Sequence, residues 1–306
     1  MTTLVFGHKS PDTDSTGSPI AWAWYLSEVA GTPAEAVLLG APNTEAAFML
    51  EHWGLEQPRI IEDVEPDQAV VVVDTNNPAE LPAGLPKADI KQIIDHHKLV
   101  GGIETKAPIE ITIRPLACTA TVMADLMGGA LASAPEGIKG AMLTCILSDT
   151  LAFRSPTTTD HDRAVAERLA GELSIDMNDL ADKMFAAKSD VSAFSEAELI
   201  RMDSKEYTVD GTSFRVSVLE TTAPKMVLDR KDALMAAMPD VAAEDGVQQV
   251  LLFVVDILNE EATLLVPNPL VKSVAENSFG AAVSGDTVVL PGVMSRKKQI
   301  IPALKL

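Results

Sequence analysis

The chain has 306 residues, of which 47 % are apolar and 22 % charged, so it is long enough for two domains of ordinary size. It carries 24 Lys and Arg against 44 Asp and Glu, and the net charge of −20 argues against general duplex binding and against docking on anionic lipid. The longest stretch without a charged residue, from Ser15 to Ser27, is too short to span a membrane, and no secretory signal is visible. We therefore expect a soluble, cytoplasmic protein that binds neither nucleic acid nor membranes.

The first half of the chain alternates short apolar runs with helix-like segments, which is typical of a parallel sheet covered on both faces. We expect strands at 4–6, 37–39 and 69–73, a strand that ends at 93–94, and a more exposed strand at 109–113. We expect helices at 15–30 and 44–52, and mostly helices from 118 to 187. The run 69–73 is apolar on both faces, as in a central parallel strand.

A small and polar run at 188–195 marks a domain boundary. The predicted organisation is a first domain over 1–188, a linker or hinge over 189–195, and a second domain over 196–306. In the second domain we expect strands near 214–219, 250–255 and 263–266 and a helix near 231–238. The predicted fold class is α/β, with an N-terminal parallel sheet and a smaller, mixed α/β C-terminal domain.

Histidine and aspartate residues follow three of the expected strands. His8, Asp12 and Asp14 lie in the loop after the first strand, Asp74 closes the run at 70–73, and Asp95, His96 and His97 follow 93–94; Asp149 ends an apolar, helix-like stretch. In open parallel sheets, ligands bind at the carboxyl ends of the strands. A carboxylate buried there is costly unless it is paired or bound to a metal. Each element alone can be an ordinary turn or cap, but the joint pattern favours a site.

A set made only of Asp and His suits manganese or cobalt better than an all-oxygen calcium or magnesium site. The six candidate metal ligands are His8, Asp12, Asp14, Asp74, His96 and Asp149. Six ligands are too many for one catalytic ion with open positions, and they fit two ions about 3.5–4 Å apart that share a carboxylate.

A cationic segment, Ser295–Gln299, stands out in this acidic chain, and the apolar segments on either side predict that it is a loop. Arg and Lys there can bind phosphate oxygens, with Lys205 a weaker candidate for the same role, although a solvated tail is the simpler alternative. His52 and His161 read as helix-surface and helix-cap residues, and Cys118 and Cys145 as buried thiols.

Five motifs together closely resemble family II, manganese-dependent inorganic pyrophosphatase, a member of the DHH phosphoesterase superfamily. They are Gly-His-Lys-Ser-Pro-Asp-Thr-Asp-Ser at 7–15, Val-Val-Asp at 72–74, Asp-His-His at 95–97, Ser-Asp-Thr at 148–150 and Ser-Arg-Lys-Lys-Gln at 295–299. The Asp-His-His and Asp-x-Asp elements are shared across the superfamily, whereas the first and last motifs together are specific to this family.

The resemblance implies a role for each matching residue. His8 and Asp12 would hold one ion and Asp14, His96 and Asp149 the other, with Asp74 bridging and Asp95 orienting a ligand. The catalytic and substrate-binding residues would be His97, Lys205, Arg296 and Lys297. The active site would lie in the cleft between the two domains, and a homodimer would form through the N-terminal domain.

The implied activity is hydrolysis of pyrophosphate to two orthophosphates by a hydroxide that bridges two Mn²⁺ ions. Co²⁺ could replace manganese, and Mg²⁺ would enter with the substrate. His97 would help to polarise or protonate the leaving phosphate, and the three cations would stabilise its charge. Only 51 residues separate His97 from Asp149, so a nucleotide-binding CBS insert is not expected.

Three alternatives stay open. A short-chain exopolyphosphatase shares the second-domain type. A DHH-type phosphodiesterase or nuclease is less favoured, because no histidine lies beyond His161. A non-catalytic scaffold would have no use for a full ligand set.

Overall fold

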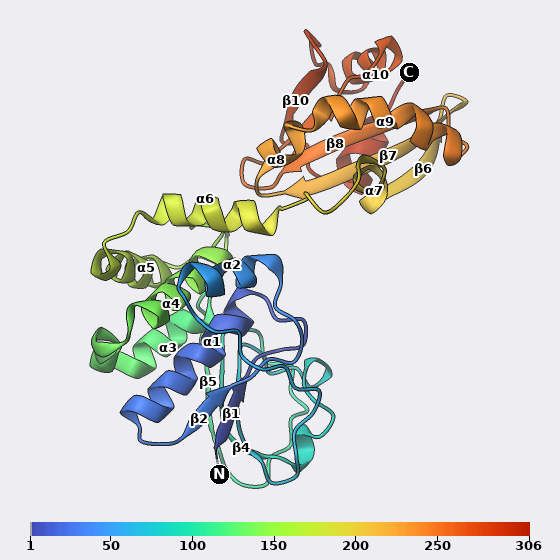
Figure 1. Ribbon diagram of the computed structural model, residues 1–306. Helices are drawn as coiled ribbons and strands as arrows, with labels where there is room; N and C mark the ends of the chain where they lie inside the picture. The colour runs from blue at the N-terminus through green and yellow to red at the C-terminus, as the bar shows by residue number, and fades with distance from the viewer. Residues whose placement is uncertain (1) are drawn as a thin grey trace. The chain divides into compact units, whose positions relative to one another are not determined.

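A computed structural model describes residues 2–306, which form two compact units, the first ending at Lys188 and the second beginning at Ser189 (Figure 1). Each unit has its own sheet and its own apolar core. Within the described residues, no helix combines the length and the apolar character needed to cross a membrane.

The sheet of the first unit confirms the predicted parallel topology. Its strands are β1 (Thr3–Phe6), β2 (Ala34–Ala36), β3 (Ala69–Val73), β4 (Asp89–Asp95) and β5 (Glu110–Ile113). They lie in the order β2-β1-β3-β4-β5, and every neighbouring pair is parallel. After β1, the chain forms β2 on one side of that strand. It then forms β3, β4 and β5 in turn on the other side of β1. The connections therefore diverge between β1 and β3, which is where open α/β sheets form a ligand crevice.

Two predicted elements of this unit need correction. The expected strand at 37–39 is wrong in position, because β2 pairs with β1 three residues earlier, with Thr3 opposite Ala34. Val37 and Leu38 lie just beyond the strand and are fully buried. Because both are apolar, the sequence pattern placed the predicted strand too far along the chain. The expected helix at 15–30 is α-helical only over Thr13–Trp24 and continues as one π-helical turn, Tyr25–Val29.

Helices and short turns cover the two faces of the first sheet. The helices are α1 (Thr13–Trp24), α2 (Thr44–His52), α3 (Thr119–Met127), α4 (Glu136–Asp149), α5 (Asp160–Leu173) and α6 (Met177–Lys188). Helices α1 and α3 contact the strands, and α4 packs against α1 (Figure 1). On the other face, two leucines join an apolar cluster with Phe6 and Val72. Leu81 directly follows the 3-10 helix η2 (Pro78–Glu80), and Leu85 begins the 3-10 helix η3 (Leu85–Lys87).

The second unit is a mixed α/β domain, as predicted, and its sheet has both parallel and antiparallel pairs. Its strands are β6 (Ser204–Val209), β7 (Thr212–Thr221), β8 (Gln249–Asp256), β9 (Glu261–Leu265) and β10 (Thr287–Pro291), in the order β10-β9-β8-β7-β6. Only β7 and β8 pair in parallel. The helices are α7 (Glu196–Met202), α8 (Pro224–Leu228), α9 (Lys231–Glu244), α10 (Pro269–Phe279) and α11 (Ile301–Ala303). Two apolar clusters lie on this sheet, one with α10 and one with α7 and α9.

The segment expected to be a linker is bound to the second unit. Ser189 shares a hydrogen bond of 2.9 Å with Thr222. The Arg230 guanidinium donates to the carbonyl oxygens of Val191 and Phe194, both at 2.8 Å. The backbone from 189 to 194 is therefore held by side chains of its own unit.

Candidate active site

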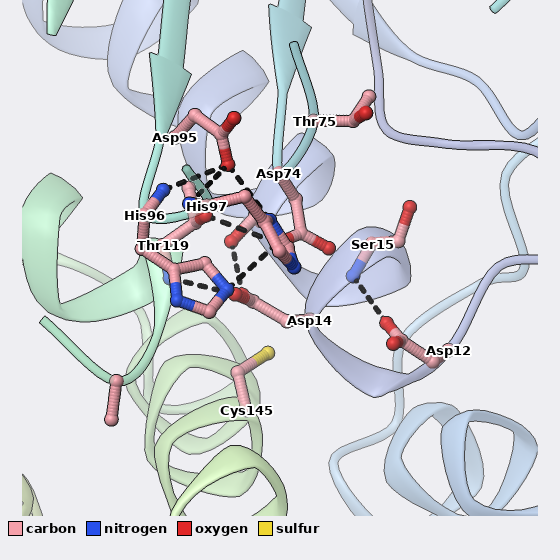
Figure 2. A network of polar contacts seen from close by, with 12 residues as sticks. Asp12, Asp14, Ser15, Asp74, Thr75, Asp95, His96, His97, Thr119 and Cys145 are labelled. Atoms are coloured by element: carbon pink, nitrogen blue, oxygen red, sulfur yellow. Dashed lines mark hydrogen bonds and ion pairs between the residues drawn. The ribbon is translucent and has the colours of Figure 1, made fainter. Parts of the chain in front are cut away.

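Loops after three strands carry the predicted ligands to the carboxyl end of the first sheet. His8 follows β1, Asp74 follows β3 and His96 follows β4. Helix α1 adds two carboxylates: Asp12 caps the helix by accepting a hydrogen bond from the backbone of Ser15 at 2.9 Å, and Asp14 lies in its first turn. Figure 2 shows the side chains of Asp14, Asp74, His96 and His97 pointing toward one another.

A first group of metal-type ligands consists of His8, Asp12 and Asp74, whose ligand atoms all lie within 4.8 Å of one another. The Nε2 atom of His8 is 3.6 Å from Asp12 Oδ2 and 3.5 Å from Asp74 Oδ2. The other ring nitrogen, Nδ1, lies 2.8 Å from the carbonyl oxygen of Lys9 and donates its proton there. This bond leaves the Nε2 lone pair of the neutral ring facing the carboxylates, as metal-binding histidines require.

A second group consists of Asp14, His96 and Asp149, again with ligand atoms within 4.8 Å of one another. Asp149 is the last residue of α4, and Asp14 is almost fully buried. His96 repeats the arrangement of His8, because its Nδ1 lies 3.2 Å from the carbonyl oxygen of Leu116. Its Nε2 atom is therefore free to bind a metal.

Asp74 lies between the two groups. Its Oδ2 faces His8, while its Oδ1 is 3.4 Å from Nε2 of His96. The backbone of Asp74 has φ +57°, in the left-handed region, and its N–H donates to Ile94 at 2.9 Å, which extends the pairing of β3 with β4. Such a conformation costs roughly 1–3 kcal/mol and is typical of functional sites. The turn directs one carboxylate oxygen toward each group.

The electrostatics of this cluster are unfavourable without a cation. Burial raises the pKa of Asp149 and of Asp74, and the neighbouring carboxylates raise both further. Burial alone would lower the pKa of His8, but its bond with Asp12 and the charge of Asp74 outweigh burial and raise that pKa to about 9. The folded protein therefore places several carboxylates close together in a buried site, where their negative charges are unfavourable unless a cation is bound.

The residues present fit a divalent metal. Within residues 2–306, the Oδ2 atom of Asp149 is buried and has no hydrogen-bond partner. The same side chain also lies beside other carboxylates, which makes the lack of a partner more costly. Buried charges of this kind are paired or coordinate metals. Two imidazole nitrogens with free lone pairs and four carboxylates make a donor set that suits manganese.

His97 and Asp95 form a pair beside the metal ligands. Nδ1 of His97 also lies 3.8 Å from Asp74 Oδ1, so Asp74, His96 and His97 make a third group of potential ligands. Asp95 is fully buried, and its Oδ1 accepts hydrogen bonds from the backbone of His96 at 2.8 Å and from Nδ1 of His97 at 2.9 Å. Burial would raise the pKa of Asp95, but the bonds from His97 and Asn76 outweigh it and lower that pKa. The ring of His97 is about half exposed, so Asp95 fixes its orientation while its outer edge faces solvent.

The predicted substrate-binding cations belong to the second unit. Lys205 on β6, together with Arg296 and Lys297, lines a hollow of about 720 Å³, here named the cationic hollow. The guanidinium of Arg296 donates to the carbonyl and carboxylate oxygens of Asp203 at 2.8 and 2.7 Å. The expected loop at 295–299 is wrong in detail, because Arg296–Ile300 forms a π-helical turn capped by Ser295. The turn forms because Ile300 is fully buried and anchors it to the core.

The two histidines that are not among the site residues lie elsewhere in the first unit, whereas Cys118 and Cys145 lie beside the carboxylates of Asp14 and Asp149. His52 stacks on Phe48 at the surface of α2. His161 lies in the first turn of α5 and contacts Asp125 at 2.8 Å. Cys118 and Cys145 are free, buried thiols.

Two buried residues that hydrogen-bond to carboxylates of the site were missed from the sequence. The Asn76 amide donates to Asp95 Oδ2 at 2.5 Å, and Thr119 bonds to both Asp14 and Asp74. Asn76 lies only two residues after Asp74, so its position was a usable signal. Thr119 lies 45 residues from Asp74 and offered no such signal.

Comparisons with known proteins agree along the whole chain. The family model described as "DHH family, N-terminal domain" matches residues 2–150, and "DHHA2 domain" matches residues 182–306. The chain is 36 % identical to a "Probable manganese-dependent inorganic pyrophosphatase" of Lactobacillus helveticus, over 98 % of this chain and 97 % of that protein. It is 40 % identical to a protein of the same name from Deinococcus radiodurans, with the same coverage of both chains.

Solved structures agree as well. A Methanococcus jannaschii "putative family II inorganic pyrophosphatase" is similar at 32 % identity and a TM-score of 0.61, covering 99 % of this chain and 98 % of that one. An exopolyphosphatase-related protein from Bacteroides fragilis shares the fold at 14 % identity and a TM-score of 0.51, covering 98 % of this chain and 89 % of that one. With identities well above 30 % over nearly the full length, the chain belongs to the family of manganese-dependent inorganic pyrophosphatases.

Proposed function

We propose that this chain hydrolyses inorganic pyrophosphate to two orthophosphates, with manganese as its metal cofactor. One observation carries the proposal: two three-ligand groups, His8–Asp12–Asp74 and Asp14–His96–Asp149, meet at Asp74. The names of the Lactobacillus and Deinococcus relatives support both the metal and the substrate.

We propose that the site holds two manganese ions, one in each group, with Asp74 shared between them. The ligands are imidazole nitrogens and carboxylate oxygens, which Co²⁺ also accepts. Mg²⁺ would enter with pyrophosphate, since it is bound through phosphates more readily than by an all-protein cage. Ions held here would supply Lewis acidity, activating water at neutral pH and neutralising phosphate charge.

The side chains of the second unit would bind the phosphate groups. Arg296, already oriented by Asp203, offers a bidentate fork to phosphate oxygens, and Lys205 and Lys297 add point charges. As charge develops on the leaving phosphate, these cations would stabilise it. In a protein of net charge −20, such local cations offset the general repulsion of a polyanion.

His97 would contact the same substrate from the first unit. Because its Nδ1 atom is bonded to Asp95, its Nε2 atom remains for a phosphate oxygen. The bond to Asp95 orients the ring, so that His97 would help to polarise or protonate the leaving phosphate.

We propose that the first unit is the metal-binding domain and the second the substrate-binding domain, with pyrophosphate held by both. Substrate binding would then require closure at a hinge. The contacts of Arg230 with Val191 and Phe194 favour the junction of Lys188 and Ser189 as the hinge over the whole run 189–195.

We further propose a cytoplasmic homodimer that forms through the first unit and binds no nucleic acid. Strand β5 is an edge of the first sheet, with Ile111 56 % exposed. Leu99, which lines the same hollow as Ile111, is 71 % exposed. Exposed apolar groups at a sheet edge favour pairing with another chain. Ile111→Glu should lower the mass measured by light scattering from that of a dimer to that of a monomer. An unchanged mass would contradict this interface.

The function is tested by phosphate release from protein stripped of metal and titrated with manganese, cobalt or magnesium. We expect manganese to restore the highest rate, with pyrophosphate preferred over tripolyphosphate and long-chain polyphosphate. Faster release from tripolyphosphate would indicate a short-chain exopolyphosphatase. No release from any of the three substrates would refute catalysis.

A further inference from the structure

Thr119 lies at the meeting point of the two ligand groups without being a metal ligand itself. It is the first residue of α3 and is completely buried. Its backbone N–H donates to Asp14 Oδ2 at 2.7 Å, and its hydroxyl donates to Asp74 Oδ1 at 3.1 Å (Figure 2). One residue therefore bonds to a carboxylate of each group.

The bond to Asp74 matters because of what a bridging carboxylate must do. Asp74 can be shared by two ions only while its Oδ2 faces His8 and its Oδ1 faces His96, as it does here. The last torsion of an aspartate is soft, so a free carboxylate could rotate and turn both oxygens toward one ion. The Thr119 hydroxyl bonds to one of these oxygens and opposes that rotation.

The bond to Asp14 adds a second restraint of a different kind. It comes from a backbone N–H at the start of a helix, where partial positive charge favours a carboxylate. The other oxygen of Asp14 accepts a bond from Ser18 at 2.6 Å. Asp14 is thus fixed by backbone as well as by side chain, and a change of the Thr119 side chain leaves the backbone bond available.

We infer that Thr119 is a positioning residue that holds Asp74 in its bridging orientation and so makes the binding of a coupled pair of ions possible. The inference rests on the proposed two-ion site. Hydrogen-bond partners of metal ligands typically contribute 10- to 100-fold in metal affinity.

Thr119→Val tests the role of the hydroxyl, because it keeps the shape of the side chain and the backbone N–H. Thr119→Ser restores a hydroxyl. Thr121→Val is a matched control in the same helix: Thr121 is equally buried, and within residues 2–306 its hydroxyl has no hydrogen-bond partner. Thr119→Ala repeats the test with a smaller side chain should valine disturb folding, which circular dichroism would show.

The measurements are the number and affinity of Mn²⁺ ions bound by metal-stripped protein in equilibrium dialysis, and the electron paramagnetic resonance signal of a spin-coupled manganese pair. We expect Thr119→Val and Thr119→Ala to weaken the binding of at least one ion by 10- to 100-fold and to lose the coupled signal. Thr119→Ser and Thr121→Val should keep both. Two coupled ions bound with unchanged affinity in a folded Thr119→Val or Thr119→Ala protein would overturn the inference alone. Fewer than two ions in the unmodified protein would overturn the two-ion proposal as well.

Discussion

In the absence of metal, the Asp149→Asn variant should be more stable to unfolding than the parent protein. In the presence of manganese, it should be less stable than the parent protein. Asp149 is buried beside Asp14 and Asp74, one of its oxygens has no hydrogen-bond partner within residues 2–306, and its pKa is raised by burial and by those neighbours. The amide removes one charge from the cluster and can donate to a neighbouring carboxylate. Without a metal, that change relieves repulsion.

The magnitude follows from the cost of an unsatisfied buried group. That cost is about 1–3 kcal/mol and is larger for a charge, so we take about 2 kcal/mol for the gain in unfolding free energy. For 150–250 residues, 1 kcal/mol moves Tm by about 2–4 °C, which predicts a metal-free variant that melts about 4–8 °C higher. Manganese at 100 times its Kd adds about 2.7 kcal/mol per ion to the parent, and the variant loses that gain for one ion.

The assay is thermal unfolding followed by circular dichroism, in chelator and in manganese. Asp182→Asn, which removes an exposed carboxylate of the same unit, should leave both Tm values near those of the parent. A variant that melts lower than the parent in chelator, or that gains as much from manganese as the parent does, would refute the placement of Asp149 in a charged metal group.

Three further predictions follow from the same site. His8→Gln should raise the manganese concentration needed for half-maximal activity by at least about 10- to 100-fold, because losing only a hydrogen-bond partner of a metal ligand already lowers metal affinity by that factor. An unchanged manganese requirement would contradict the role of His8. Lys297→Ala should lower kcat/KM about 10- to 100-fold, since a charge-assisted hydrogen bond is worth about 1.5–3 kcal/mol, while Mn²⁺ binding stays intact; Lys298→Ala, outside the cationic hollow, is its control. Because the pKa of His8 is raised from 6.5 to about 9 in the metal-free protein, the stability that its proton contributes is complete below pH 6.5 and is lost as the pH rises through about 9. The Tm in chelator should therefore fall over this range, and an equal slope in His8→Gln would disprove the assignment.

Much of the fold was predictable where local pattern and burial agree. The run Val70–Val73 forms the buried centre of β3, as its continuous β-branched residues predict. The prediction failed at residues 37–38 because the pairing partner changes there. Val37 still donates to the carbonyl of Val5 in β1, but Leu38 pairs with Ile60 in an isolated bridge, while both side chains are buried in the core. Strands β6 and β10 were missed because they are edge strands whose side chains are only partly buried, which weakens the apolar signal.

The site was predictable to the extent that topology decides it. The carboxyl ends of parallel strands meet at one edge, so His8, Asp74 and His96 could be grouped before any coordinates. The bond between Thr119 and Asp74 depends on how the start of α3 packs on the sheet, and no local pattern encodes that packing. The same is true of the bond that Arg296 donates to Asp203, which joins residues 93 positions apart.

The most direct test of the shared-carboxylate centre is a crystal structure of manganese-loaded protein with anomalous differences measured at the manganese edge. We predict two peaks about 3.5–4 Å apart, one beside His8 and Asp12, the other beside Asp14, His96 and Asp149, with an oxygen of Asp74 bound to each. A single peak, or two peaks of which one lies away from Asp74, would contradict the account.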